Sequence, residues 1–293
     1  MPWHQIAIAL EGADPAAAEA ACFAQGAVSV SLFDGADEAI LEPAPGETPL
    51  WRTVRLQALW PASADPRRLV ARLAAGLAIE PARFAVELVP DRVWEREWLR
   101  DFRPMRFGRH LWVCPGGQLP PDPHAVRLEL DPGLAFGTGT HATTAMCLEW
   151  LDGEPLVGLH VLDYGCGSGI LALAALKLGA RVATAFDIDP QALLAARENA
   201  ARNGLADRLL VVERAAALRG PYDMLMANIL AGPLVELAPS LARLARPDAP
   251  LVLAGLLDGQ VGEVAQAYRP WFDIRTAASR EGWTAIAGRR RAE

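Results

Sequence analysis

The chain has 293 residues, enough for two domains of ordinary size, and its 52% hydrophobic and 22% charged residues are typical of a globular protein. No apolar run reaches the roughly 18 residues that a membrane-spanning helix needs, and the amino terminus lacks the basic and apolar regions of a secretory signal. The four cysteines stand far apart without a CxxC pair, which argues against a zinc site or a disulfide framework and favours a reducing cytoplasm.

The negative charge is concentrated at the beginning of the chain. The formal net charge is −7, and residues 1–50 hold eight acidic side chains but no lysine or arginine. Such a region repels nucleic acid and attracts a basic partner. The alternative is a surface that only keeps the protein soluble.

The first 90 residues alternate between strand and helix patterns. Asp14-Pro15 and Asp65-Pro66 each predict the start of a helix, with aspartate as the cap and proline in the first turn, and the two helices are expected to end at Gly26 and near Gly76. The resulting βαββαβ order predicts a small ferredoxin-like α+β domain over residues 1–90. Its strands are predicted at 3–10, 27–33, 53–60 and 84–89.

Residues 91–102 predict a helix that links two domains. It carries Trp94 and Trp98 one turn apart, and we expect these side chains to pack between the domains.

From residue 103 to 293 the pattern is that of an α/β domain. Helices are predicted between most of the strands, and one of them begins at Asp189-Pro190 and ends at Gly204. This alternation predicts a parallel sheet with helices on both faces. The strands are predicted at 110–114, 125–130, 159–164, 181–186, 208–213, 222–227 and 250–255, with two more near 272–287.

A glycine-rich turn, VLDYGCGSG, follows the strand that begins near residue 159. Gly165, Gly167 and Gly169 allow a backbone with positive φ and let a ligand lie close to the main chain, and the next helix offers its free amides. Nucleotide-like cofactors bind at such turns in doubly wound folds. The spacing is GxGxG rather than the dinucleotide fingerprint GxGxxG. The alternative is a strand-to-helix turn with no ligand.

Asp187 ends the next hydrophobic run, 22 residues after Gly165. A carboxylate at this position can accept hydrogen bonds from both hydroxyls of a ribose, which makes the ligand-free alternative for the turn less favourable.

The segment from Leu130 to Thr144, LDPGLAFGTGTHATT, is too rich in glycine and threonine to form core, and we expect it to fold over a ligand. Its threonine hydroxyls, Thr144 among them, can donate to a carboxylate at the start of the next helix. The alternative is a capped loop in which Thr143 or Thr144 only closes the helix start. For His141 we expect capping or packing rather than catalysis.

Asn228 ends the hydrophobic run YDMLMA and opens the segment NILAGPL. We expect this strand end to lie beside the glycine turn, where the amide can orient an attacking amine. The alternative is a turn residue at a strand end.

Together these segments resemble the bacterial ribosomal protein L11 methyltransferases over essentially the whole length. The matching segments are PGET, WEREW, RPMRFG, LDPGLAFGTGTH, GCGSGILA, DIDPQA and NILAGPL, and the GxGxG turn is similar to motif I of S-adenosylmethionine-dependent methyltransferases. The chain departs from the family at Ala142, where a proline usually follows the histidine.

The resemblance implies a Rossmann-like, seven-stranded methyltransferase domain over 103–293 and an amino-terminal domain that binds the substrate protein. It also implies that Thr144, Gly165, Asp187 and Asn228, with Gly167 in the same turn, bind S-adenosylmethionine. Lysine and N-terminal amino groups of ribosomal protein L11 would be trimethylated. Asn228 would orient the amine, and no general base is assigned. We expect no metal, no direct contact with nucleic acid, no membrane association, and a cytoplasmic monomer.

Two other functions fit parts of the sequence. A methyltransferase of release factors or nucleic acid would share the cofactor turn, but release-factor enzymes carry an NPPY-type strand end where this chain has NILA, and an RNA enzyme would need a basic groove. A non-catalytic module that only docks on ribosomal protein is the third possibility.

Overall fold

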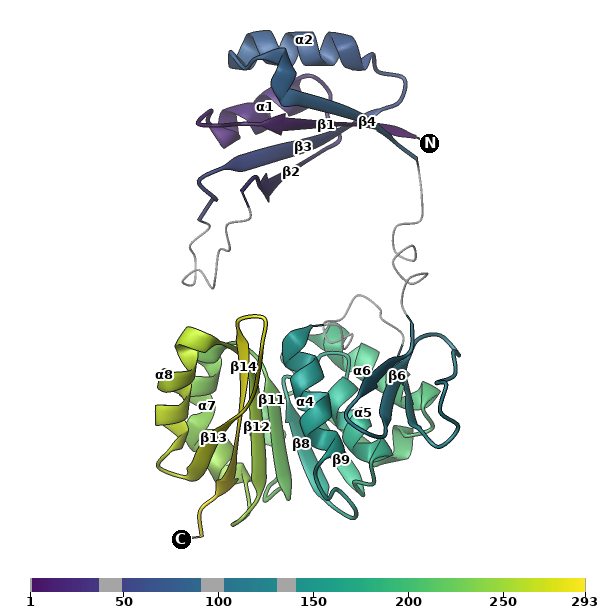
Figure 1. Ribbon diagram of the computed structural model, residues 1–293, viewed down its shortest axis with the longest axis vertical. Helices are drawn as coiled ribbons and strands as arrows, with labels where there is room; N and C mark the ends of the chain where they lie inside the picture. Colours follow the sequence, from purple (N-terminus) through teal and green to yellow (C-terminus); the bar gives the residue numbers. More distant parts are fainter. Residues whose placement is uncertain (1, 37–48, 91–102, 131–140, 293) are drawn as a thin grey trace. The chain divides into compact units, whose positions relative to one another are not determined.

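The computed structural model describes residues 2–36, 49–90, 103–130 and 141–292. The chain divides into two compact units, Met1–Glu97 and Trp98–Glu293 (Figure 1). The predicted linker helix at 91–102, with Trp94 and Trp98, and residues 131–140 of the predicted ligand loop lie outside the described residues.

The amino-terminal unit holds a four-stranded antiparallel sheet in the order β2-β3-β1-β4. Its elements follow one another in the predicted order as β1 (Trp3–Ala9), α1 (Pro15–Ala24), β2 (Ser29–Asp34), β3 (Val54–Pro61), α2 (Pro66–Leu77) and β4 (Phe84–Val89). Asp14 and Asp65 cap the helices as predicted, since each side chain accepts a first-turn amide at 3.0 Å. α2 ends at Leu77, near Gly76 as predicted, and Ala78 caps it in the left-handed conformation.

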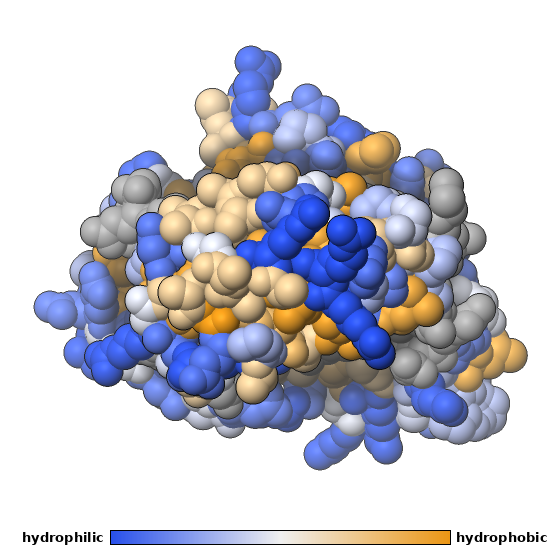
Figure 2. All heavy atoms as spheres, turned by 90° about the horizontal axis from the view of Figure 1, so that it is seen from above, coloured by the Kyte–Doolittle hydropathy of each residue, from blue (hydrophilic) through white to orange (hydrophobic). Residues whose placement is uncertain are grey.

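Both helices of this unit pack on the same face of its sheet. The shared core contains Ile6, Ile8, Leu56 and Trp60 from the strands, Ala18 and Cys22 from α1, and Leu69 and Leu73 from α2. On the side where α2 lies, hydrophilic side chains are interspersed with hydrophobic ones (Figure 2). That side is therefore not a continuous apolar docking surface.

The carboxyl-terminal unit is built on a seven-stranded sheet in the order β10-β9-β8-β11-β12-β14-β13. The first five strands in this order run parallel, so their carboxyl ends meet at one edge. The strands are β8 (His160–Tyr164), β9 (Val182–Phe186), β10 (Leu209–Val212), β11 (Met224–Asn228), β12 (Pro250–Leu257), β13 (Phe272–Arg280) and β14 (Trp283–Arg290).

The expectation of a parallel sheet is wrong at one side. β14 pairs antiparallel with both β12 and β13, so the sheet is mixed. The cause is local: β13 and β14 are joined by a turn at Glu281 and Gly282, both with positive φ, and so short a connection can only reverse the chain.

The two strands predicted first in this unit do not join the large sheet. They are β6 (Leu111–Cys114) and β7 (Val126–Glu129), and they form a separate three-stranded sheet with β5 (Met105–Phe107). The buried Asp152 carboxylate at the end of the following helix accepts the Leu111 amide at 3.0 Å and connects this small sheet to the rest of the unit.

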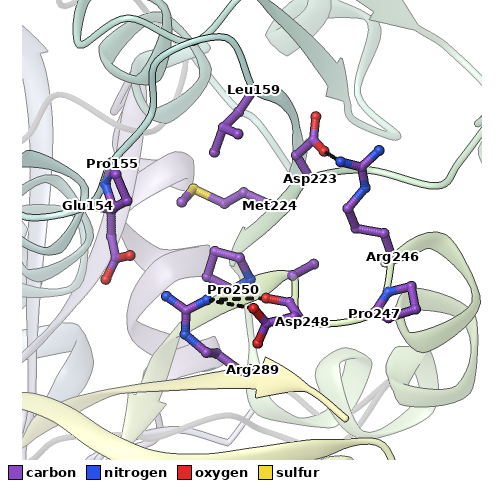
Figure 3. A pocket seen from close by; sticks show the side chains of 11 residues that line it. Glu154, Pro155, Leu159, Asp223, Met224, Arg246, Pro247, Asp248, Pro250 and Arg289 are labelled. Atoms are coloured by element: carbon purple, nitrogen blue, oxygen red, sulfur yellow. Dashed lines mark hydrogen bonds and ion pairs between the residues drawn. The ribbon is translucent and has the colours of Figure 1, made fainter. Parts of the chain in front are cut away.

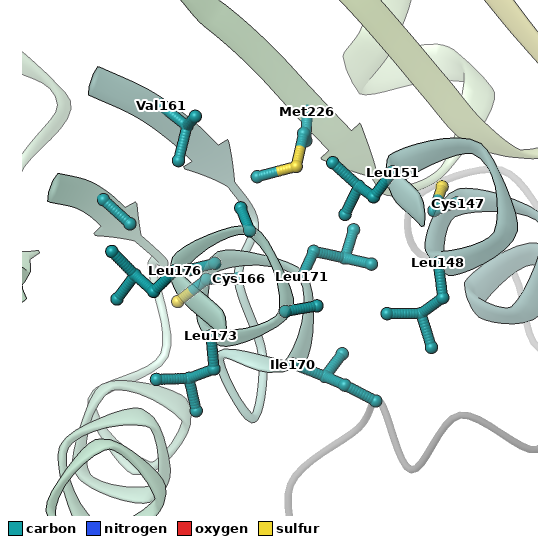
Figure 4. Close-up of a cluster of buried hydrophobic side chains, with 14 of the residues drawn as sticks. Cys147, Leu148, Leu151, Val161, Cys166, Ile170, Leu171, Leu173, Leu176 and Met226 are labelled. Atoms are coloured by element: carbon teal, nitrogen blue, oxygen red, sulfur yellow. The ribbon is translucent and has the colours of Figure 1, made fainter. Parts of the chain in front are cut away.

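Helices cover both faces of the large sheet, as predicted (Figure 1). One face packs against α4 (Ala142–Asp152), α5 (Ile170–Lys177) and α6 (Pro190–Arg202), and the other against α7 (Ala231–Leu244) and α8 (Val261–Tyr268). On the first face, leucines of α4 and α5 meet Val161 of β8 and Met226 of β11 (Figure 4). Within the described part of the chain, no helix is long and apolar enough to cross a membrane.

Candidate active site

The glycine turn connects β8 to α5 at the carboxyl edge of the sheet. Gly165, Gly167 and Gly169 have φ values of +78°, +52° and +79°, which non-glycine residues rarely adopt. The amides of Gly165 and Cys166 donate to the Phe186 carbonyl at 2.7 and 2.9 Å, so the turn is held against the end of β9. A side chain at Gly165 would also collide with Ile229. The turn therefore presents bare backbone at this edge.

Asp187 follows β9 directly and lies beside this turn. One carboxylate oxygen accepts the Gly167 amide at 2.9 Å, and the other accepts the Asp189 amide at 3.0 Å. The side chain is half-buried, so it still faces solvent at the carboxyl edge. Its position next to the turn is what the sequence predicts for a residue that accepts ribose hydroxyls.

Asn228 and Thr144 come from distant parts of the sequence and meet at the same edge. β11 pairs with β8 so that Ala227 lies opposite Tyr164, which places Asn228 next to the start of the glycine turn. The Asn228 amide nitrogen donates to the Thr144 hydroxyl at 3.1 Å. Thr144 is buried in the first turn of α4. This bond turns the Asn228 amide oxygen away from Thr144 and leaves the Thr144 hydroxyl proton for another acceptor.

His141 is the cap of α4, which confirms the expectation of capping for this residue. Its Nδ1 accepts the Thr143 amide at 3.4 Å and lies 2.8 Å from the Thr143 hydroxyl. Thr143 and Thr144 lie inside the first turn, so neither is the capping residue. The imidazole also meets the Trp283 indole edge to face, with ring centroids 4.9 Å apart.

Asp163 is a buried acid for which the sequence suggested no role. One carboxylate oxygen accepts the Ala172 amide at 3.0 Å, and the other has no hydrogen-bond partner among the described residues. Burial, with a smaller contribution from the charge of Asp187, raises the pKa of this carboxyl from 3.8 to about 7, although the Ala172 hydrogen bond acts to lower it. The signal in the sequence was a single acid directly before the glycine turn.

These side chains can bind and orient a ligand. The site combines the bare backbone of the glycine turn, one half-buried carboxylate, one hydroxyl and one amide, with a positively polarised helix terminus behind the turn. Such groups suit a polar, ribose-containing cofactor and an incoming amine. Among the residues that the structure describes, no three His, Cys, Asp or Glu side chains are grouped so that they could hold a metal ion.

A cavity of about 230 Å³ lies at the opposite edge of the sheet (Figure 3). It is lined by Met224 and Pro250, the first residues of β11 and β12, and is therefore far from the strand ends that carry Asn228. Arg246 on its rim is paired with Asp223. This cavity is separate from the candidate active site.

Comparison with known proteins relates the whole chain to one family. Residues 2–291 match the family model described as ribosomal protein L11 methyltransferase (PrmA). A ribosomal protein L11 methyltransferase of Pseudomonas paraeruginosa is 52% identical over 100% of both chains. One of Pseudomonas putida strain GB-1 is 51% identical and covers 99% of this chain and 100% of its own length.

A solved structure agrees with these relatives. The crystal structure of a ribosomal protein L11 methylase from Lactobacillus delbrueckii subsp. bulgaricus superposes with a TM-score of 0.60 at 33% sequence identity. The match covers 65% of this chain and 100% of that one.

Proposed function

Because the chain belongs to the ribosomal protein L11 methyltransferase (PrmA) family, we propose that it transfers methyl groups from S-adenosylmethionine to amino groups of ribosomal protein L11. The acceptors are lysine side chains and the N-terminal amine. The observation that carries this proposal is the meeting of the glycine turn, Asp187 and the Thr144–Asn228 pair at one sheet edge. Each of these groups suits one part of the reaction.

In this proposal the glycine turn would hold the cofactor. The backbone at Gly165 and Gly167 would hold its methionine portion, and the Asp187 carboxylate would accept hydrogen bonds from the two ribose hydroxyls. Thr144, which accepts a hydrogen bond from Asn228, uses its own proton to donate to the methionine carboxylate. S-adenosylmethionine supplies an electrophilic methyl group on a sulfonium.

The protein then has to present a neutral amine in line with the sulfur–methyl bond. A free lysine has a pKa of about 10.4, so an apolar site next to a sulfonium favours loss of its proton. The Asn228 amide oxygen accepts a hydrogen bond from the attacking nitrogen and directs its lone pair at the methyl group. The amine attacks the methyl carbon, the carbon–sulfur bond breaks, and the electron pair remains on sulfur.

The amino-terminal unit is the substrate-recognition domain in this proposal. Its βαββαβ order and the sheet order β2-β3-β1-β4 support a ferredoxin-like fold, and the large sheet with helices on both faces supports a Rossmann-like methyltransferase fold. The first 50 residues of the amino-terminal unit carry eight acids and no lysine or arginine, which suits a basic ribosomal protein. We place the enzyme in the cytoplasm as a monomer, without a direct nucleic-acid partner.

The rival functions predict different acceptors. A nucleic-acid methyltransferase would label RNA, a release-factor enzyme would label an amide nitrogen, and a docking module would bind ribosomal protein without labelling it. Flexible amines fit Asn228-Ile229-Leu230 better than planar amides, since this strand end lacks the prolines and the aromatic residue that clamp a planar group.

One experiment separates these functions. The purified protein is incubated with methyl-labelled S-adenosylmethionine and either ribosomal protein L11, release factor or ribosomal RNA. We expect label in L11 alone, on lysine and N-terminal amines by mass spectrometry. L11 with acetylated amines is the matched control and should stay unlabelled. Label in RNA or in the acetylated protein would contradict the proposed function.

A further inference from the structure

Trp283 is an aromatic residue at the active-site edge that the proposed function does not use. It is the first residue of β14, it is half-buried, and its indole lies edge to face with His141 at 73°. His141 caps the helix that carries Thr144, and Thr144 accepts the hydrogen bond of Asn228. The beginning of α4 thus contacts Trp283 through His141 and Asn228 through Thr144.

Trp283 and Asn228 lie on the same face of the large sheet. The indole packs at the border of the hydrophobic cluster shared by α4 and α5, and the Asn228 amide also bonds to α4. In the sheet Asn228 lies opposite Ala254, whereas Trp283 lies opposite Leu257, three residues further along β12 toward the carboxyl edge. The indole therefore lies further toward the carboxyl edge of the sheet than the Asn228 amide.

The hairpin that carries Trp283 is held in place at two points. The Asp258 amide after β12 donates to the Gly282 carbonyl at 3.0 Å. Arg280, just before the turn, bonds to both carboxylate oxygens of Glu149 on α4 at 3.0 and 3.1 Å. An aromatic side chain on a supported hairpin loses little freedom when a ligand packs on it.

We propose that the Trp283 indole lines the approach to Asn228 and packs along the aliphatic stem of the target lysine. This inference rests on the proposed function, because it requires a protein amine to reach Asn228. A lysine carries four methylenes that an aromatic surface can cover, whereas an N-terminal amino group has no such stem. Trp283 is therefore a specificity residue that favours lysine side chains over the α-amino group of the same substrate.

The test compares the two kinds of acceptor within one substrate molecule. Wild-type and Trp283→Ala enzymes methylate L11, and mass spectrometry gives the ratio of lysine to α-amino methylation. We expect the substitution to lower this ratio about tenfold, equivalent to about 1.4 kcal/mol, and Trp283→Phe to restore most of it. The affinity for S-adenosylmethionine, measured by calorimetry, should change less than twofold.

Trp271→Ala is the matched control. Trp271 is a half-buried tryptophan that packs on the other face, before β13, at the edge opposite the active site. Its loss should leave the ratio unchanged. An unchanged ratio in Trp283→Ala, or an equal fall of both methylations, overturns the inference. If the wild-type enzyme methylates no amine of L11, the proposed function itself is wrong.

Discussion

The Asp187 carboxylate accepts the Gly167 amide at 2.9 Å, so the acid after β9 holds the glycine turn after β8. Its second oxygen accepts the Asp189 amide at 3.0 Å. Since each carboxylate oxygen can accept two hydrogen bonds, both oxygens keep one acceptor position. The same side chain can therefore shape the turn and bind the two ribose hydroxyls of the cofactor.

Replacing Asp187 by alanine should weaken binding of S-adenosylmethionine by roughly 100-fold or more, or about 2.7 kcal/mol. The variant loses two hydrogen bonds to a charged acceptor and also the support of the Gly167 amide. Calorimetry gives the affinity, and circular dichroism checks that the fold is kept. Asp207→Ala, an exposed acid in the same unit, controls for the change in charge. Equal affinities of Asp187→Ala and wild type would contradict the assignment.

Gly165→Ala should destabilise the carboxyl-terminal unit by more than about 2 kcal/mol. A left-handed backbone costs a non-glycine residue roughly 1–2 kcal/mol, and the new methyl group would also collide with Ile229. Gly262→Ala is the control, because this helical glycine has open space around it and alanine favours helix. Denaturant unfolding followed by circular dichroism measures both. A Gly165→Ala protein as stable as Gly262→Ala would show that the turn relaxes without strain.

The sequence predicted those parts of the fold that depend on local signals. Asp14, Asp65 and Asp189 all cap helices whose first residue is proline, because both the cap and the fixed φ act within one turn of chain. The pairing of β14 with the distant β12 and the separate sheet of β5, β6 and β7 could not be predicted in this way. Which strand pairs with which depends on contacts between residues far apart in the chain.

The candidate site also combines features that local sequence signals predict with features that depend on distant contacts. Gly165 and Asp187 were predictable because each directly follows a predicted strand, and the carboxyl ends of these parallel strands meet at one sheet edge. The bond between Thr144 and Asn228 was not, since it joins residues 84 positions apart. The unusual pKa of Asp163 was hidden as well, because it follows from complete burial, which a single acid in a hydrophobic run does not reveal.

The stability of the carboxyl-terminal unit should fall between mildly acidic and neutral pH because of Asp163. Its pKa is raised from 3.8 to about 7 by burial in the folded protein. As pH rises, the Asp163 carboxyl therefore loses its proton at a lower pH in the unfolded chain than in the folded protein. The free energy of unfolding decreases over this range until the pH passes about 7. Asp163→Asn removes this dependence and keeps a similar shape.

The free energy of unfolding of Asp163→Asn minus that of wild type should thus increase by roughly 2–3 kcal/mol from pH 5 to pH 8, at about 1.4 kcal/mol per pKa unit. Denaturant unfolding of both proteins at the two pH values gives this difference and cancels the other titrating groups. Parallel pH profiles would show that Asp163 is already charged in the folded protein at pH 5.

Removing the amino-terminal unit should separate recognition from cofactor binding. A protein that begins at Arg103 keeps both hydrophobic clusters of the carboxyl-terminal unit, while the lost residues have a core of their own. It should bind S-adenosylmethionine with unchanged affinity by calorimetry but methylate intact L11 at least 100-fold more slowly. As a control, added residues 2–90 should compete with the full-length enzyme for L11. Full activity of the shortened protein would refute this division of roles.

Asn228→Ala should lower the rate of methylation far more than the affinity for the cofactor. By analogy with the loss of one oxyanion-hole donor, removing the hydrogen bond that orients the attacking amine costs roughly 2–4 kcal/mol of barrier. This corresponds to a rate about 30- to 1,000-fold slower in single turnover. The affinity, measured by calorimetry, should fall less than tenfold. If the rate stays near wild type, Asn228 is a turn residue; if affinity and rate collapse together, its main role is to hold the cofactor.

Thr144→Val tests whether the hydrogen bond to Thr144 holds the Asn228 amide in its working orientation. Valine keeps the shape of threonine but cannot accept the bond from the Asn228 amide nitrogen, which in wild type is 3.1 Å long and fixes which way the amide faces. Without it the amide can rotate, so the rate should fall, though less than in Asn228→Ala. Thr144→Val also removes the hydroxyl that donates to the methionine carboxylate, and the cofactor affinity should fall too. Thr144→Ser, which keeps the hydroxyl, should restore both quantities.

In Thr144→Val/Asn228→Ala the rate loss should be smaller than the product of the single losses, because both substitutions disrupt the same oriented amide. Fully multiplicative losses would show that the two residues act independently.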